Sequence, residues 1–171
     1  MKVEADYLRD RDTLLRHGAF IHGVHQSIRD ALAQVGDLVT KLNAEHGMQV
    51  EFGSQDRTGV LRSGFVSIGI FWTQPIFNMV GDYEKDECHL RVAEFSGLLT
   101  LPGESRFYIE NPRLLKEHRF KVDVAHDRTL VWRAAKTTEK IPPLQLADRI
   151  VQIFLDLVSR ANQGKVEPPH I

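Results

Sequence analysis

The sequence lacks most of the features that mark the larger functional classes, and each absence excludes something. Its single cysteine, Cys88, has no partner for an internal disulfide and cannot build a cysteine-based zinc site alone. The 22 lysines and arginines against 23 aspartates and glutamates give a formal charge of -1, so no overall field attracts nucleic acid or an anionic membrane. No apolar run approaches the about 18 residues of a membrane span, and acidic residues replace the basic start of a secretion signal. We therefore expect a cytoplasmic protein without membrane contact.

Signatures of common catalytic sites are also absent. The chain has no phosphate-binding Gly-x-x-x-x-Gly-Lys-Ser/Thr loop, no Gly-x-Gly-x-x-Gly turn, no Gly-x-Ser-x-Gly elbow and no Cys-x-x-Cys pair. We therefore predict no cofactor and no catalytic residues, and we favour a non-enzymatic role.

The composition is that of an ordinary globular protein. Of 171 residues, 42% are apolar and 26% are charged, which suffices for one domain with its own core. We expect that domain to cover residues 1–164. The remainder, residues 165–171, contains Pro168 and Pro169 and is predicted to be a frayed tail.

The longest pattern is helical and runs from residue 14 to residue 42. Apolar residues recur there every seven positions, at Leu14, Ile21, Ile28, Val35 and Leu42. From Ile28 onward the apolar face is three residues wide in each seven, which favours packing on a core over an intermolecular coiled coil. Such a helix would be about 43 Å long, whereas five or six strands make a sheet about 24 to 29 Å wide. We therefore expect a break near Gly18 and Gly23, or a first half that projects and packs on another subunit.

After Gly47 the apolar period changes from helical to two, which is typical of strands. The pattern predicts strands over residues 48–52, 60–72, 88–100, 106–110, 120–124 and 129–134, with one helical turn over 113–117. Gly64, Ser67 and Gly69 leave little side chain on one face of the 60–72 segment, so another element is expected to approach closely there.

A second apolar helix follows Pro142 and Pro143 and ends near residue 162. The fold class predicted is therefore α+β: a long N-terminal helix, a five- or six-stranded, mainly antiparallel meander sheet, and a C-terminal helix packed on it. The two helices lie on one face or one on each. In the first case the other face becomes an interaction surface.

Two groups of residues suggest metal sites, and neither has the spacing of one. His17 and His25 lie eight residues apart, about 12 Å along a helix, and His22 and His25 have no acid one turn away to complete a ligand set. Residues 82–87 contain four acids but lack the glycine and the distal glutamate of a calcium-binding loop. We predict no metal.

A basic segment spans residues 113–140. Lys121 and Arg133 would face solvent if their strands pair, and with Arg119 they would form a basic patch near Trp132 or Tyr108 that contacts a nucleic-acid backbone or an acidic partner. The alternative is a solvated sheet face whose charges discourage aggregation. The residues predicted to bind a partner are Trp72, Tyr108, Arg119, Lys121, Trp132 and Arg133.

These observations lead to a binding or assembly module, expected as a homodimer, that recognises a protein or peptide through an exposed sheet face or a helix-sheet groove. One alternative is a small-molecule binder or enzyme with a cavity between the sheet and the long helix, where His25 and Cys88 supply polar wall groups. Another is a nucleic-acid accessory protein that uses the 113–140 segment, which the balanced charge disfavours.

Overall fold

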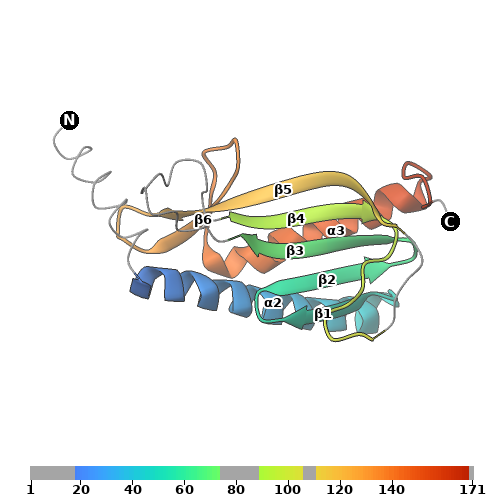
Figure 1. The fold of residues 1–171 in the computed structure, drawn as a ribbon, viewed down its shortest axis with the longest axis horizontal. Coiled ribbons are helices and arrows are strands. Elements are labelled where there is room, and N and C mark those ends of the chain that lie inside the picture. Colours follow the sequence, from blue (N-terminus) through green and yellow to red (C-terminus); the bar gives the residue numbers. More distant parts are fainter. Residues whose placement is uncertain (1–17, 74–88, 106–110, 170–171) are drawn as a thin grey trace.

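The computed structural model describes residues 18–73, 89–105 and 111–169 of the 171-residue chain. Figure 1 labels its main helices and strands. In chain order the elements are α2 (Gly18–His46), β1 (Glu51–Gln55), β2 (Thr58–Ser63), β3 (Val66–Thr73), β4 (His89–Ser96), β5 (Arg113–Val124), β6 (Leu130–Ala134), β7 (Lys140–Ile141), the 3-10 turn η1 (Pro143–Gln145) and α3 (Leu146–Asn162).

The strands form one antiparallel sheet in sequence order, from β1 to β7. The predicted α+β class, with a long N-terminal helix, a meander sheet and a C-terminal helix, is confirmed. The described residues form seven strands rather than five or six. The segment predicted as one strand over 60–72 is a hairpin, because Gly64 takes a left-handed conformation at φ +61° and turns the chain between β2 and β3.

The prediction of a helical turn over 113–117 is also wrong, because those residues open the twelve-residue strand β5. Pairing with β4 along its length outweighs the local preference of the segment. The predicted strand over 106–110 lies outside the described residues.

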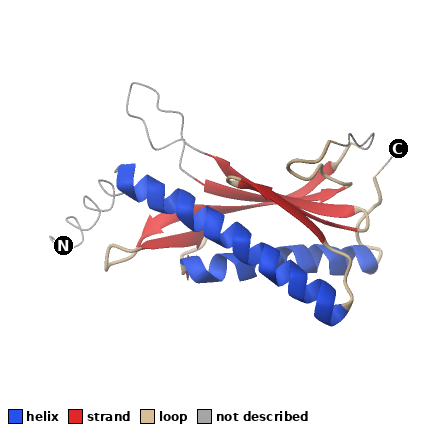
Figure 2. Cartoon of the chain, turned by 90° about the horizontal axis from the view of Figure 1, so that it is seen from below, coloured by secondary structure: helices blue, strands red, loops and turns tan. Residues whose placement is uncertain are grey.

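Both helices lie on the same face of the sheet, as Figure 2 shows. Ile28 and Val35 of α2 and Phe154 of α3 are at most 1% exposed, and they pack with sheet residues such as Ile68 and Leu90. Burial of apolar surface on this scale contributes roughly 1.5 to 3 kcal/mol for each large side chain. Of the apolar positions expected to face the core between Ile28 and Val39, five are buried and Leu38 is partly buried; the buried ones are Ile28, Ala31, Leu32, Val35 and Val39.

The helix α2 continues through Gly23 without the expected break. Its 29 residues, about 43 Å at about 1.5 Å per residue, lie along the strands instead of across them (Figure 1). The twelve residues of β5 extend about 40 Å at about 3.3 Å each. The apparent mismatch in length disappears because the strand length, not the sheet width, is the relevant dimension. Within the described residues no helix is long and apolar enough to cross a membrane.

Polar contacts hold the C-terminal part of the chain to the sheet. Glu94 of β4, only 1% exposed, faces the helices, where it accepts a hydrogen bond from Arg160 of α3 and lies 2.6 Å from His118 Nε2. Beyond α3, Val166 is buried and the Glu167 carbonyl accepts a hydrogen bond from Ser96 Oγ. The segment expected to fray is therefore packed as far as Glu167.

Candidate functional site

The face of the sheet opposite α2 and α3, here called the open face, is covered by no described helix (Figure 2). Residues directly opposite each other on paired strands share a face. Because Trp132 and Ile141 are paired and buried beneath the helices, the neighbouring pair Arg133 and Lys140 belongs to the open face. The same register assigns Lys121 to it.

One loop, residues 97–105, lies across the open face at β1–β3. Ser67 Oγ donates to the Gly97 carbonyl at 2.7 Å and accepts from the Leu99 amide at 3.2 Å. A Cβ added to Gly69 would lie 3.1 Å from Leu99 Cδ1, and one added to Gly53 would lie 3.2 Å from Leu101 Cβ. The predicted close approach is confirmed at Ser67 and Gly69, where the approaching element is this loop. At Gly64, in the turn between β2 and β3, no atom lies within 4 Å of an added Cβ.

The side chain of Arg62, on β2, holds this loop against the open face. Its guanidinium donates to the Leu99 carbonyl at 3.2 Å, to Glu104 at 3.0 and 3.1 Å and to Glu51 Oε2 at 2.9 Å. Burial alone would lower the pKa of Arg62, but the hydrogen bonds to Glu51 and Glu104 outweigh it and raise that pKa. The guanidinium therefore stays charged, and the loop is fixed to the open face by charge-assisted bonds.

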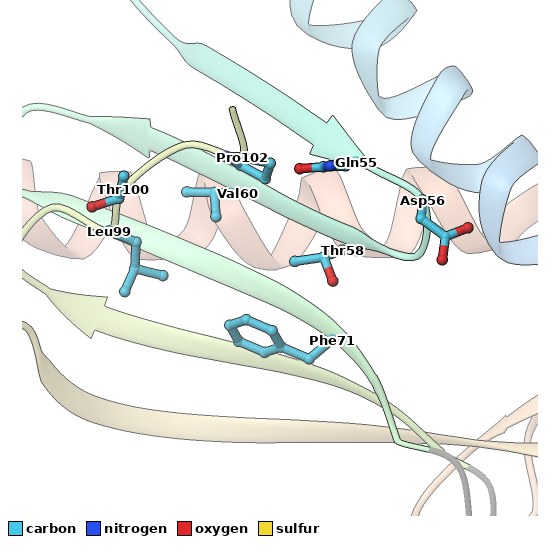
Figure 3. Close-up of a pocket in the computed structure, with 8 residues that line it drawn as sticks. All are labelled: Gln55, Asp56, Thr58, Val60, Phe71, Leu99, Thr100 and Pro102. Atoms are coloured by element: carbon cyan, nitrogen blue, oxygen red, sulfur yellow. The ribbon is translucent and has the colours of Figure 1, made fainter. Parts of the chain in front are cut away.

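A groove with a volume of about 510 Å³ lies between this loop and the sheet (Figure 3). Its walls are both apolar and polar, and Thr100 and Asp56 are exposed to solvent. The Phe71 ring lies over Gly69, where an added Cβ would come within 2.4 Å of it. The lining residues are Gln55, Asp56, Thr58, Val60, Phe71, Leu99, Thr100 and Pro102.

Basic side chains lie beside the groove on the neighbouring strands. Phe71 of β3 is directly opposite Arg91 of β4, which is directly opposite Arg119 of β5. Glu117 accepts from Arg91 at 2.9 and 3.0 Å and from Arg119 at 2.6 Å. These hydrogen bonds, the one from Arg91 first, lower the pKa of Glu117 to about 2. Glu117 is therefore ionised at neutral pH and partly offsets the repulsion between the two arginines.

A second row of positive charges lies two residues further along β5. Lys121 of β5, Arg133 of β6 and Lys140 of β7 are directly opposite one another in turn. Asp123 Oδ2 lies 3.5 Å from Arg133 Nε. We call Arg91, Arg119, Lys121, Arg133 and Lys140 the basic rows. The registers of three strand pairs, β4–β5, β5–β6 and β6–β7, place these five side chains next to one another on the open face.

The residues predicted to bind a partner divide between the two faces. Arg119, Lys121 and Arg133 lie together on the open face. Trp132 is fully buried on the helix face, where its Nε1 donates to Ser27 Oγ at 3.1 Å. Trp72 lies beside it, with ring centroids 6.0 Å apart. Tyr108 falls outside the described residues.

His25, expected to line a cavity between sheet and helix, takes part in a polar contact at the β1–β2 turn. Its Nε2 lies 3.0 Å from Arg57 Nη1, and its ring meets Trp72 edge to face at 6.1 Å. Burial first, and then the charge of Arg57, lower the pKa of His25, so the ring is neutral and accepts this hydrogen bond. The 510 Å³ groove lies on the other face, and Cys88 lies outside the described residues.

The apolar lining of the groove was not predicted as a site. Phe71 was recognisable only as one member of a predicted strand face that also carries Phe65 and the small residues Ser63, Ser67 and Gly69. Leu99 and Pro102 reach it through a loop whose position depends on Arg62 and Glu104, far apart in sequence. No sequence motif signals that contact.

Within the described ranges, no three His, Cys, Asp or Glu side chains gather in an arrangement that could hold a metal ion. Comparison of the chain with protein-family models, with curated protein sequences and with solved structures gave no match. The fold and the site therefore define the class directly: an α+β sheet protein with both described helices on one face and a groove beside basic rows on the other.

Proposed function

We propose that this chain is a non-enzymatic protein-binding module of the cytoplasm, and that a segment of its partner lies on the open face with an apolar side chain in the groove. The observation that carries the proposal is the placement of α2 and α3 on one face, which leaves the opposite face with a groove of about 510 Å³. Pockets that bind ligands are typically about 300 to 1,000 Å³.

The lining of the groove supports an apolar side chain of a peptide as its occupant. Val60, Phe71, Leu99 and Pro102 supply the apolar surface, and Gln55 and Thr58 supply hydrogen-bonding groups of the kind that fix a peptide backbone. Burial of one large apolar side chain there would contribute roughly 1.5 to 3 kcal/mol. The remaining affinity must come from the surface beside the groove.

A selection experiment tests the proposal. A displayed library of random peptides about twelve residues long, each able to extend about 40 Å, is selected against the wild-type chain and then against Thr100→Trp. Thr100 is an exposed groove residue, so the indole should block the groove while the chain still folds. Leu144→Trp is the matched control, because Leu144 is 77% exposed in η1, outside the groove.

The expected result is enrichment of peptides with an aromatic or large aliphatic residue that bind the wild type and Leu144→Trp but not Thr100→Trp. If no peptides are enriched, or if Thr100→Trp binds them equally well, the open-face proposal is overturned. The homodimer expected from the sequence stays a prediction, and light scattering at micromolar concentration would remove it if the chain is monomeric.

A further inference from the structure

We infer that the partner segment is acidic, with carboxylates three to four residues away from the apolar side chain that occupies the groove. This inference rests on the proposed function and names the chemistry of the partner. It follows from the position of the basic rows relative to Phe71, from their charge, and from the position of the two tryptophans on the helix face.

The spacing comes from the strand register. Phe71, Arg91 and Arg119 occupy directly opposite positions on three successive strands, β3 to β5. Neighbouring strands are about 4.8 Å apart, so Arg119 lies about 10 Å from Phe71 across the sheet, and β6 with Arg133 about 14 Å. An extended peptide advances about 3.3 Å per residue. A segment crossing the strands would therefore place its third and fourth residues beyond the anchor over the basic rows.

The charge of this surface is uneven within a nearly neutral chain. On β4–β7 Arg91, Arg119, Arg133 and Lys140 place four formal positive charges on the open face, against the two carboxylates Glu117 and Asp123. The whole chain has a formal charge of -1. Like charges directly opposite each other destabilise a sheet, and here Arg91 faces Arg119 and Arg133 faces Lys140. An acidic partner would relieve that repulsion.

A peptide fits the open face better than a single-stranded nucleic acid does. Proteins that bind single strands stack successive bases on aromatic side chains. Here Trp72 and Trp132 lie on the helix face, and the aromatic ring that lines the groove, Phe71, lies over Gly69 as part of the groove wall. Glu117 and Asp123 stand among the basic side chains, where they would repel a continuous row of phosphates. A peptide with spaced carboxylates can alternate with them.

The test measures the binding of defined fluorescent probes by anisotropy. The first peptide carries one phenylalanine followed by glutamates at the third and fourth positions in an otherwise serine-rich chain. The second replaces both glutamates by glutamine, and the third moves them next to the phenylalanine. A single-stranded oligothymidine of similar length is the fourth probe.

Two double variants supply the matched charge comparison. Arg119→Gln with Lys140→Gln removes two charges from the basic rows, and Lys41→Gln with Lys165→Gln removes two exposed charges outside the open face. We expect the first peptide to bind about tenfold more weakly to the basic-row variant, because exposed ion pairs each contribute up to about 1 kcal/mol. It should bind the control variant as it binds the wild type, and more weakly as salt is raised.

The outcomes separate this inference from the proposed function. If the glutamine peptide binds as tightly as the glutamate peptide, and Thr100→Trp still abolishes binding, the acidic partner is overturned and the groove stands. If the oligothymidine binds more tightly than any peptide and depends on Arg119 and Lys140, the inference is overturned in favour of nucleic acid. If the library selection enriches no groove-dependent peptide, the proposed function fails as well.

Discussion

At the scale of single residues, Glu117 lowers the repulsion between two arginines of the basic rows. Its carboxylate is shared by Arg91 and Arg119, which are directly opposite each other on β4 and β5. Its side chain is 19% exposed, whereas those of the arginines are 38% and 54% exposed, so solvent screens part of the attraction. The arrangement leaves the guanidinium groups near the surface while lowering the cost of placing them together.

Replacement of Glu117 by glutamine should cost stability in a pH-dependent way. The pKa of Glu117 is about 2 in the folded chain against an ordinary value of 4.5. A lowered carboxyl pKa stabilises the folded state above the unfolded value, and that contribution disappears as the pH falls from about 4.5 to about 2. We expect Glu117→Gln to lower the free energy of unfolding by about 1 kcal/mol at pH 7 after solvent screening, and by only a small fraction of that near pH 2, where the folded carboxylate is about half protonated.

Urea unfolding of the wild type and the variant at several pH values measures this difference. Glu45→Gln, a change at an exposed residue of α2, is the control and should leave the free energy of unfolding nearly unchanged. If Glu117→Gln lowers the free energy of unfolding by the same amount at pH 7 and near pH 2, the role given to the carboxylate is contradicted.

The orientation of single residues on this surface could be predicted from sequence only where apolar and polar residues alternate along the strand. Lys121 and Asp123 alternate with Phe120 and Val122, so their outward orientation follows from sequence. Trp132 also alternates with Arg133, yet its burial depends on packing against Ser27, more than a hundred residues earlier in the chain. That kind of contact has no local signal.

At the scale of elements, the long helix shows how a correct pattern can lead to a wrong boundary. The apolar stripe correctly predicts that α2 packs on the sheet, but Gly23 does not break it. Glycine weakens a helix without ending it when packing on both sides holds the backbone; here Phe20 packs before Gly23, and Val24 and Ile28 pack after it. At Gly64 the error was the opposite: a glycine that does end a strand was not recognised. The alternation of apolar residues continues through the turn, so the sequence did not reveal the hairpin.

The continuity of α2 gives a stability prediction at Gly23. No atom lies within 4 Å of the position of an added Cβ there, and alanine in a helix interior is favoured over glycine by roughly 0.5 to 1 kcal/mol. Gly23→Ala should therefore raise the free energy of unfolding by that amount. Gly59→Ala is the contrasting variant, because its Cβ would lie 2.8 Å from Leu32 Cδ2, and it should lower stability. A neutral or destabilising Gly23→Ala would mean that the helix is interrupted there.

At the scale of the whole molecule, the main feature is the difference between the two faces of one sheet. Amphipathic stripes predict that α2 and α3 pack on strands, and the strand pattern predicts an antiparallel meander, so the fold class followed from sequence. The sequence did not show which face of the sheet each helix covers. The second face of β2 and β3 also carries apolar residues, Val60 and Phe71, which a loop rather than a helix partly covers.

The most direct test of the account is to locate where a groove-binding peptide contacts the chain. Methyl resonances of isotope-labelled protein are followed as the phenylalanine–glutamate peptide is added. We predict that the Val60 and Leu99 methyl signals shift and that those of Leu144 and Val158, on η1 and α3, stay in place. Shifts confined to Leu144 and Val158, with Val60 and Leu99 unchanged, would contradict the assignment of the open face as the binding surface.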